Sequence, residues 1–123
     1  MERLQLEASP DTPKIILDSV KNIFEISQRS FPEDAMAFYY PVLNWVEEYK
    51  KNPNASTVLN INLEYYNTSS AKQLFKLFSL LEELSKSTEV LVRWHYKNED
   101  GDMKVSGERF AKLFKVKFEL VEH

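Results

Sequence analysis

Residues 57–72 read TVLNINLEYYNTSSAK, in which a strand pattern is followed at once by the start of a helix pattern. Over the first ten positions apolar and polar side chains alternate, which is typical of a β-strand whose two faces meet different surroundings. One face carries Leu59, Ile61, Leu63 and Tyr65, and the other carries Asn60, Asn62, Glu64 and Tyr66. From Ala71 onward apolar residues recur at helical spacing, so Asn67 to Ser70 stand between a strand and a helix.

The same kind of pattern extends in both directions. Further strands are expected at residues 4–6, 14–18, 22–27, 89–96 and 116–121, and helices at residues 30–52, 71–84 and from the turn at 98–101 to about Phe114. The first helix is expected to begin at Ser30, because Ser30 and Glu33 match an S-x-x-E capping box. In the third helix the side chains expected to face inward are those of Phe110, Leu113 and Phe114.

This order of elements predicts an α/β fold in one domain spanning residues 1–123, a size common for single domains. Strand–helix–strand connections give parallel neighbours, whereas the two short strands at 14–18 and 22–27 resemble a hairpin. The expected sheet is therefore mixed and has about six strands. Strands buried on both faces are apolar throughout, but these alternate, so the three helices are expected mainly on one face.

Composition excludes several classes of protein. The chain has no cysteine and only two glycines, which leaves no thiol chemistry and no Gly-rich phosphate loop. The net charge of −3 comes from well-mixed acids and bases, so a nucleic-acid partner is not expected. No segment resembles a signal peptide or reaches the roughly 20 apolar residues of a membrane span. A cytoplasmic protein without membrane insertion, cofactor or metal is expected.

Catalytic patterns are sparse. The chain has two histidines, His95 and His123, no cluster of metal ligands, and no G-x-S-x-G motif to present a serine. A hydrolase built around His95 ranks last among the hypotheses. Arg93 and His95 share the polar face of one strand and are expected near Asn60, Asn62 and Glu64. That face is interpreted as solvated, or else, together with Tyr66, as a surface for a partner.

The segment Asn67-Thr68-Ser69-Ser70-Ala71-Lys72 is the best candidate site. Its plainest interpretation is helix capping, because Asn, Ser and Thr are the preferred N-cap residues. However, the first turn lacks the acidic residue that usually complements a helix dipole, and Lys72 follows instead. A phosphate on Thr68, Ser69 or Ser70 would therefore find Lys72 and backbone N–H donors close by. Local chemistry does not choose among the three hydroxyls.

Three segments, residues 27–34, 63–72 and 93–96, resemble the SiaC family of bacterial regulatory phosphoproteins, and the resemblance extends over essentially the whole chain. It implies a fold like that of STAS-domain anti-sigma-factor antagonists and a non-enzymatic role in partner switching. It also implies that a Ser/Thr kinase with a histidine-kinase-like ATPase domain modifies Thr68, and that a PP2C-type phosphatase reverses the modification. Asn67, Ser69, Ser70 and Lys72 would then form the surroundings of the phosphate.

The resemblance further implies that the unmodified protein binds and activates a diguanylate cyclase, which raises cyclic di-GMP and favours biofilm formation. A second hypothesis of a different class stays open. In it, the N-terminus of the second helix and Lys72 form a site for a small anion or nucleotide.

Overall fold

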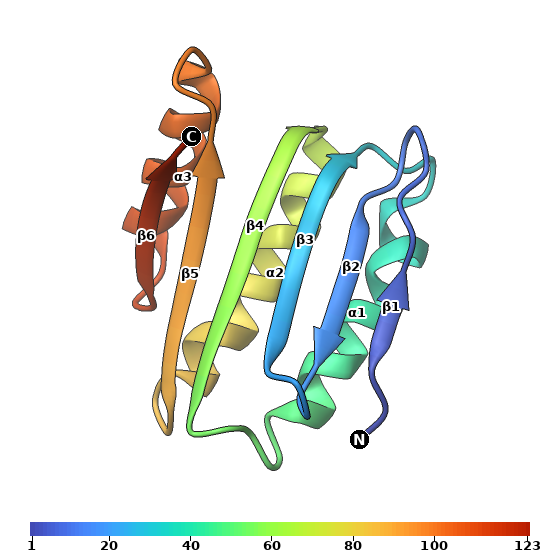
Figure 1. Ribbon diagram of the computed structural model, residues 1–123, viewed down its shortest axis with the longest axis vertical. Coiled ribbons are helices and arrows are strands. Elements are labelled where there is room, and N and C mark those ends of the chain that lie inside the picture. The colour runs from blue at the N-terminus through green and yellow to red at the C-terminus, as the bar shows by residue number, and fades with distance from the viewer.

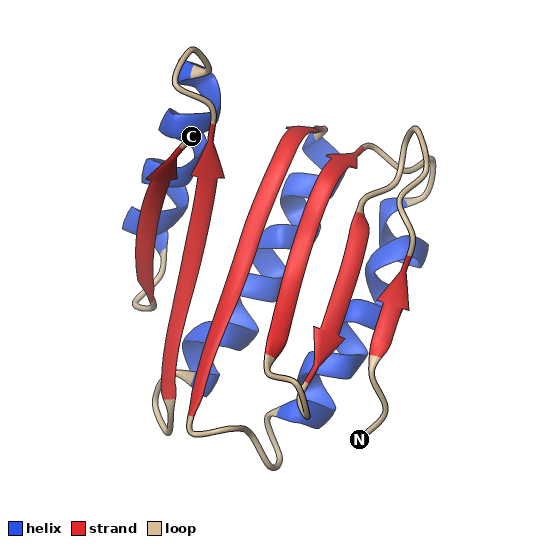
Figure 2. Ribbon diagram, viewed as in Figure 1, coloured by secondary structure: helices blue, strands red, loops and turns tan.

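This computed structural model describes residues 1–123, in which three strands are followed by three pairs of a helix and a strand. The strands are β1 (Leu4–Leu6), β2 (Lys14–Asp18), β3 (Ile23–Ser30), β4 (Ser56–Tyr66), β5 (Glu89–Tyr96) and β6 (Lys117–Glu122). The helices are α1 (Ala35–Tyr49), α2 (Thr68–Leu84) and α3 (Gly101–Leu113). The predicted number, type and order of the elements are confirmed (Figure 2).

The strands form one mixed sheet in the order in which they occur in the chain (Figure 1). The first three pair antiparallel, and β3 to β6 pair parallel. Each parallel connection contains one helix, as the strand–helix–strand pattern predicts. Leu59 of β4 pairs with Phe24 of β3 on one side and with Val92 of β5 on the other, at the centre of the sheet.

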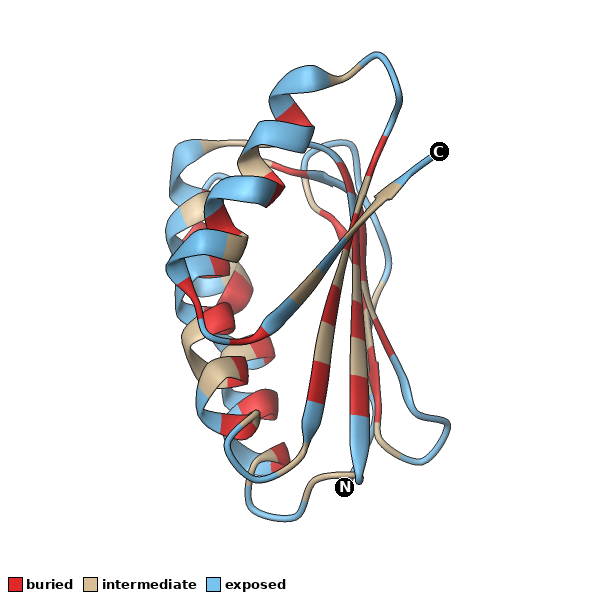
Figure 3. Ribbon diagram, turned by 90° about the vertical axis from the view of Figure 1, so that its left-hand side faces the viewer, coloured by how far each residue is buried: buried red, intermediate tan, exposed pale blue.

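All three helices lie on one face of the sheet, and the other face is open (Figure 3). The inward side chains of the alternating strands meet the apolar stripes of the helices between these two layers. The hydrophobic core lies there, and its largest fully buried side chains include Trp94, Tyr39, Tyr49 and Phe78. The predicted arrangement of three helices on one face is confirmed. The alternation in β4 and β5 therefore reflects a buried face and a solvated face.

The start of the first helix differs from the prediction. Helix α1 begins at Ala35, and its N-cap is Asp34, whose side chain accepts a hydrogen bond from the Ala37 amide. Ser30 is instead the last residue of β3, where it pairs with Tyr66 and is fully buried. The local capping-box pattern was overridden because parallel pairing with β4 keeps this segment extended.

A bulge also changes the faces of two tyrosines. Gln28, at a φ of 83°, pairs with Leu63, whereas the next residue Arg29 pairs with Tyr65, so Glu64 is an extra residue in β4. The alternation is therefore reversed beyond Glu64. Tyr65 is exposed, and Tyr66 turns toward the helices and contacts Trp94 edge to face at 6.0 Å between ring centroids. The prediction that Tyr65 shares a face with Leu59, Ile61 and Leu63 was wrong for this reason.

One further prediction about burial and one helix start differ from the structure. Leu113 was expected to face inward, but it is 57% exposed at the end of α3. Helix α2 begins at Thr68, three residues earlier than its apolar stripe, because the polar segment itself is helical. Ser70 and Gln73 are consequently buried in α2, although neither is apolar.

Candidate functional site

The strand–helix corner after β4 is fixed by its backbone and its cap. Asn67 is the N-cap of α2, and its side-chain oxygen accepts a hydrogen bond from the Ser70 amide at 2.9 Å. Its carbonyl accepts from the Ala71 amide, and its own amide donates to the Ser30 carbonyl at 3.0 Å. The corner is thus tied both to its helix and to the end of the neighbouring strand β3. Capping, the plainest interpretation of this segment, is therefore confirmed, and Asn67 is the residue that performs it.

The three hydroxyls after Asn67 differ sharply in exposure. Thr68 and Ser69 are exposed in the first turn of α2, whereas Ser70 is fully buried. Ser70 donates to the Ser30 carbonyl at 3.0 Å, and its Oγ lies 2.8 Å from Ser30 Oγ. A buried hydroxyl held by two hydrogen bonds is not accessible to a modifying enzyme. The structure therefore leaves Thr68 and Ser69 as the candidates.

Ser70 belongs to a buried chain of hydroxyls beneath the corner. Ser30 Oγ, which contacts Ser70, also lies 2.6 Å from the hydroxyl of Tyr39 in α1. Burial raises the pKa of Tyr39 to about 12, although the hydrogen bond with Ser30 acts in the opposite direction. These three hydrogen-bonded hydroxyls join β3, α1 and the head of α2, and they hold the corner in place.

A pocket of about 280 Å³ lies between the head of α2 and α3, with Thr68 in its wall. The strands β4 and β5 pair only as far as Ile61 and Trp94, and they diverge beyond that pair (Figure 1). Apart from Thr68, the pocket is lined by Tyr66, Asn67, Ala71, Ser106, Arg109, Phe110 and Leu113. Half of its lining residues are apolar, and its one charged residue is Arg109.

Sequence reasoning missed Arg109 and Ser106, which reach the corner from a helix 30 or more residues further along the chain. No local motif marks them, and only the packing of α3 beside α2 brings them to Thr68. Lys72, which was predicted to surround a phosphate, is exposed and does not line this pocket. The cationic residue that shares this pocket with Thr68 is therefore Arg109, which is also exposed.

The three residues of the predicted partner surface do not form one surface. Tyr66 lies on the helix side in the pocket, where burial raises the pKa of its hydroxyl and Ser106 and Arg109 act in the opposite direction. Arg93 and His95 lie on the open face of the sheet. Arg93 pairs with Glu119 of β6 at 3.2 Å, and His95 Nε2 lies 2.9 Å from Asn60 Oδ1. The bulge at Glu64 causes this separation.

The open face carries a polar groove of about 330 Å³, lined by Glu25, Ser27, Gln28, Asn60, Asn62 and His95. The pKa of His95 is lowered, first by partial burial and then by the charges of Arg93 and His123. Its hydrogen-bond partner is an amide, as expected of a structural histidine. The structure contains no group of three metal-binding side chains, and no helix is long and apolar enough to span a membrane.

Comparison with known proteins gives the class of protein that this fold and corner belong to. A family model described as SiaC family regulatory phosphoprotein matches residues 6–123. The class that the matching model describes is thus one of regulatory phosphoproteins. The chain belongs to the SiaC family, which confirms the resemblance found in its sequence.

Individual relatives agree with this assignment over their whole length. An uncharacterized protein of Pseudomonas aeruginosa strain UCBPP-PA14 is 27% identical over 124 residues, covering 100% of this chain and 98% of that protein. The solved structure of SiaC of Pseudomonas aeruginosa matches with a TM-score of 0.90 at 27% identity, and each chain is covered completely. A crystal structure of the diguanylate cyclase SiaD in complex with its activator SiaC, also from Pseudomonas aeruginosa, matches with a TM-score of 0.91 at 27% identity, over 98% of this chain and 99% of that chain.

Proposed function

We propose that this chain is a non-enzymatic signalling protein whose binding to a diguanylate cyclase is switched by phosphorylation of Thr68. In its unmodified form it binds and activates the cyclase, and so raises cyclic di-GMP. The observation that carries this proposal is the placement of Thr68, which is exposed at the head of α2 in the wall of a pocket. Support for the partner comes from the structural relative that is an activator in complex with a cyclase.

The choice of Thr68 rests on comparing the three hydroxyls. Ser70 is buried and hydrogen-bonded, so a kinase would have to unfold the corner to reach it. Ser69 is exposed but does not line the pocket. Thr68 alone is both accessible and part of a concave, half-apolar surface of the kind that a partner's side chain fills. A rigid corner also presents its hydroxyl in one conformation, which favours recognition by a specific kinase.

Phosphorylation would change this surface strongly. A phosphate brings a charge of about −1.5 to −2 at neutral pH, and a fitted interface would have to desolvate it. A loss of about 3 kcal/mol in binding free energy weakens an interaction roughly a hundredfold, which is enough for a switch. A Ser/Thr kinase with a histidine-kinase-like ATPase domain would transfer the phosphoryl group from ATP to Thr68 Oγ1. A PP2C-type phosphatase would remove it by hydrolysis.

The decisive experiment combines modification with binding. The purified protein is incubated with ATP and a Ser/Thr kinase of the proposed class from the same organism. The modified residue is mapped by mass spectrometry, and affinity for the cyclase is measured by calorimetry. We expect a single phosphate on Thr68 and a roughly hundredfold loss of affinity. A Thr68→Ala variant should bind the cyclase with the same affinity before and after incubation with the kinase and ATP.

Two variants test whether a negative charge weakens binding only at residue 68 or anywhere near it. Thr68→Asp should weaken cyclase binding, whereas Ser69→Asp, which adds the same charge one residue away, should weaken it much less. A phosphate mapped to another residue, or equal effects of the two variants, would contradict the proposal. Binding of nucleotide or phosphate by the unmodified protein, measured in the same calorimeter, would instead favour the anion-binding hypothesis.

A further inference from the structure

Helices α2 and α3 each contribute one wall of the pocket beside Thr68. Thr68 and Ala71 come from α2, and Ser106, Arg109 and Phe110 come from α3. Ser106 and Arg109 are three residues apart in α3, so both side chains point from the same face of that helix. A hydroxyl and a guanidinium therefore share with Thr68 a pocket of about 280 Å³.

Arg109 is not engaged by any carboxylate. The ion pairs of the structure engage Arg3, Lys50, Lys51 and Arg93, and Arg109 takes part in none of them. Burial raises the pKa of Tyr66, another residue of the pocket, and the nearby charge of Arg109 acts in the opposite direction. Arg109 is thus an exposed lining residue of the pocket whose guanidinium forms no ion pair.

The chemistry of this pair suits a phosphate. A guanidinium presents parallel N–H donors that match two phosphate oxygens, and such charge-assisted pairs are stronger than neutral hydrogen bonds. The Ser106 hydroxyl adds a donor for a third oxygen. The apolar residues Phe110 and Leu113 complete the lining of the pocket on the α3 side.

We propose that Arg109, assisted by Ser106, is the receptor for the phosphate carried by Thr68. This inference rests on the proposed modification of Thr68 and adds its mechanism. The phosphate would turn into the protein's own pocket, join α2 to α3, and fill the cavity that the unmodified protein offers to its partner. The switch then works by occupying the binding pocket from within, in addition to repelling the partner by charge.

The test measures the second pKa of the phosphate on residue 68. Phosphothreonine is installed at residue 68 by genetic encoding, so that the kinase is not needed, and its second pKa is measured by ³¹P NMR titration. A free phosphothreonine has a second pKa of about 6. Contact with Arg109 stabilises the dianion, so we expect a value below about 6 in the folded protein and a return to about 6 in urea.

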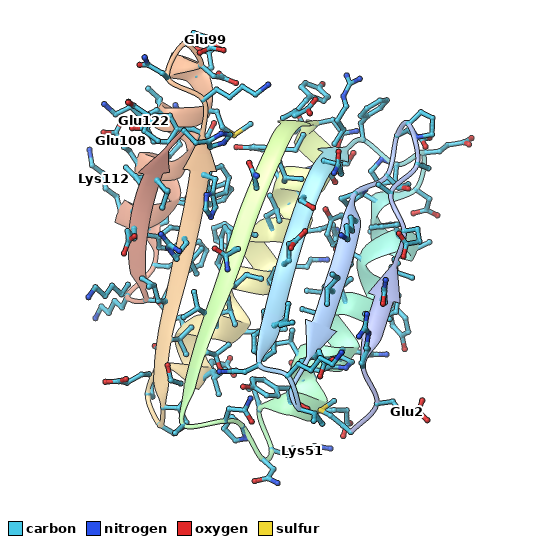
Figure 4. All side chains as sticks on the ribbon, viewed as in Figure 1. Glu2, Lys51, Glu99, Glu108, Lys112 and Glu122 are labelled. Carbon is cyan, nitrogen blue, oxygen red and sulfur yellow. The ribbon has the colours of Figure 1, made fainter.

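The matched variants are Arg109→Gln and Lys112→Gln, which remove the same charge from the same helix. Lys112 is exposed, does not line the pocket, and projects from α3 at the outer edge of the molecule (Figure 4). We expect Arg109→Gln to raise the phosphate pKa by roughly 0.5 or more, and Lys112→Gln to leave it nearly unchanged. The phosphate should also raise the melting temperature by roughly 4 °C in the unsubstituted protein, and not in Arg109→Gln.

The outcomes separate this inference from the proposed function. A phosphate pKa that responds equally to both substitutions, or that is the same folded and in urea, would overturn the role of Arg109. That result would leave modification of Thr68 and its effect on the cyclase intact. Conversely, a kinase that does not modify Thr68 would overturn the proposed function, although the titration would still report whether Arg109 binds a phosphate placed there.

Discussion

The Oγ of Ser70 lies 2.8 Å from the Oγ of Ser30, although the two residues are 40 positions apart in the chain. Both are fully buried, one at the head of α2 and the other at the end of β3. Ser70 also donates to the Ser30 carbonyl, and that same carbonyl accepts from the Asn67 amide. The corner that displays Thr68 is therefore anchored from beneath, so the exposed hydroxyl projects from a rigid support.

This anchor predicts the effect of removing the Ser70 hydroxyl. Ser70→Ala loses the hydrogen bonds to both oxygens of Ser30, and we expect the free energy of unfolding to fall by about 1–3 kcal/mol. Urea denaturation monitored by circular dichroism measures the change. Ser69→Ala is the matched control, because its exposed hydroxyl should contribute less than about 0.5 kcal/mol. Equal stability of the two variants would show that the buried hydroxyls do not support the corner.

The two glycines offer a second stability test, because both lie in α3 in different surroundings. A Cβ on Gly107 would lie 2.4 Å from Cδ1 of Trp94 and 2.7 Å from Cδ2 of Leu120, whereas a Cβ on Gly101 would meet nothing within 4 Å. Trp94 is fully buried, and its indole donates to the Met103 carbonyl, so it cannot move aside easily. Overpacking should outweigh the better helix propensity of alanine at position 107.

We therefore expect Gly107→Ala to lower the free energy of unfolding by about 1–3 kcal/mol. Gly101→Ala should leave it unchanged or raise it by up to about 1 kcal/mol. Thermal denaturation of the two variants beside the parent protein measures both effects. A stabilised Gly107→Ala protein would mean that α3 packs less closely on Trp94 than the structure has it.

Much of this fold can be predicted from periodicity. The strand at 57–66 has a two-residue period that assigns Leu59, Ile61 and Leu63 to the core, and the structure buries all three. That pattern depends only on which face is buried, so it survives without knowledge of the neighbours. It fails at Tyr65, because the bulge at Glu64 arises from the register with β3, and a single strand does not encode its partner's register.

Only the features of the candidate site that depend on neighbouring residues in the sequence could be predicted. Asn67 caps α2 through atoms within four residues, and cap chemistry is local. The burial of Ser70 and the nearness of Arg109 depend on contacts with β3 and α3, which composition and spacing do not reveal. The capping box at Ser30 shows the reverse error, in which a valid local signal was overridden by the pairing of Ser30 with Tyr66.

His95 gives a prediction about pH. Its pKa is lowered from the ordinary value of 6.5, first by burial and then by Arg93 and His123, whereas Glu119 and Glu25 act in the opposite direction. The unfolded chain therefore binds a proton at His95 more readily than the folded chain. The contribution of this residue to stability is present above about pH 6.5 and is lost as the pH falls through the lower, folded pKa.

Two measurements check this expectation. NMR titration of the His95 ring should give a pKa below 6.5. The free energy of unfolding should fall more steeply between about pH 7.5 and pH 5.5 in the parent protein than in His95→Gln, which keeps a polar group facing Asn60 and does not titrate. Parallel curves for the two proteins would rule out a contribution from His95.

The pocket makes a last prediction, about the surface that a partner meets. Leu113 and Val105 are both exposed apolar residues of α3, at 57% and 48% exposure, but only Leu113 lines the pocket beside Thr68. A partner side chain that fills the pocket would bury Leu113, and burial of a leucine side chain is worth about 1.5–3 kcal/mol when complete. We therefore expect Leu113→Ala to weaken cyclase binding by roughly tenfold or more.

Val105→Ala is the control for this effect, because it removes exposed apolar surface from the same helix outside the pocket. Both substitutions should change the free energy of unfolding by less than about 0.5 kcal/mol, so a difference in binding would come from the interface and not from folding. Calorimetric titration of the cyclase with each variant measures it. If Val105→Ala weakened binding as much as Leu113→Ala did, the partner would dock along α3 generally, and the pocket would not be its point of attachment.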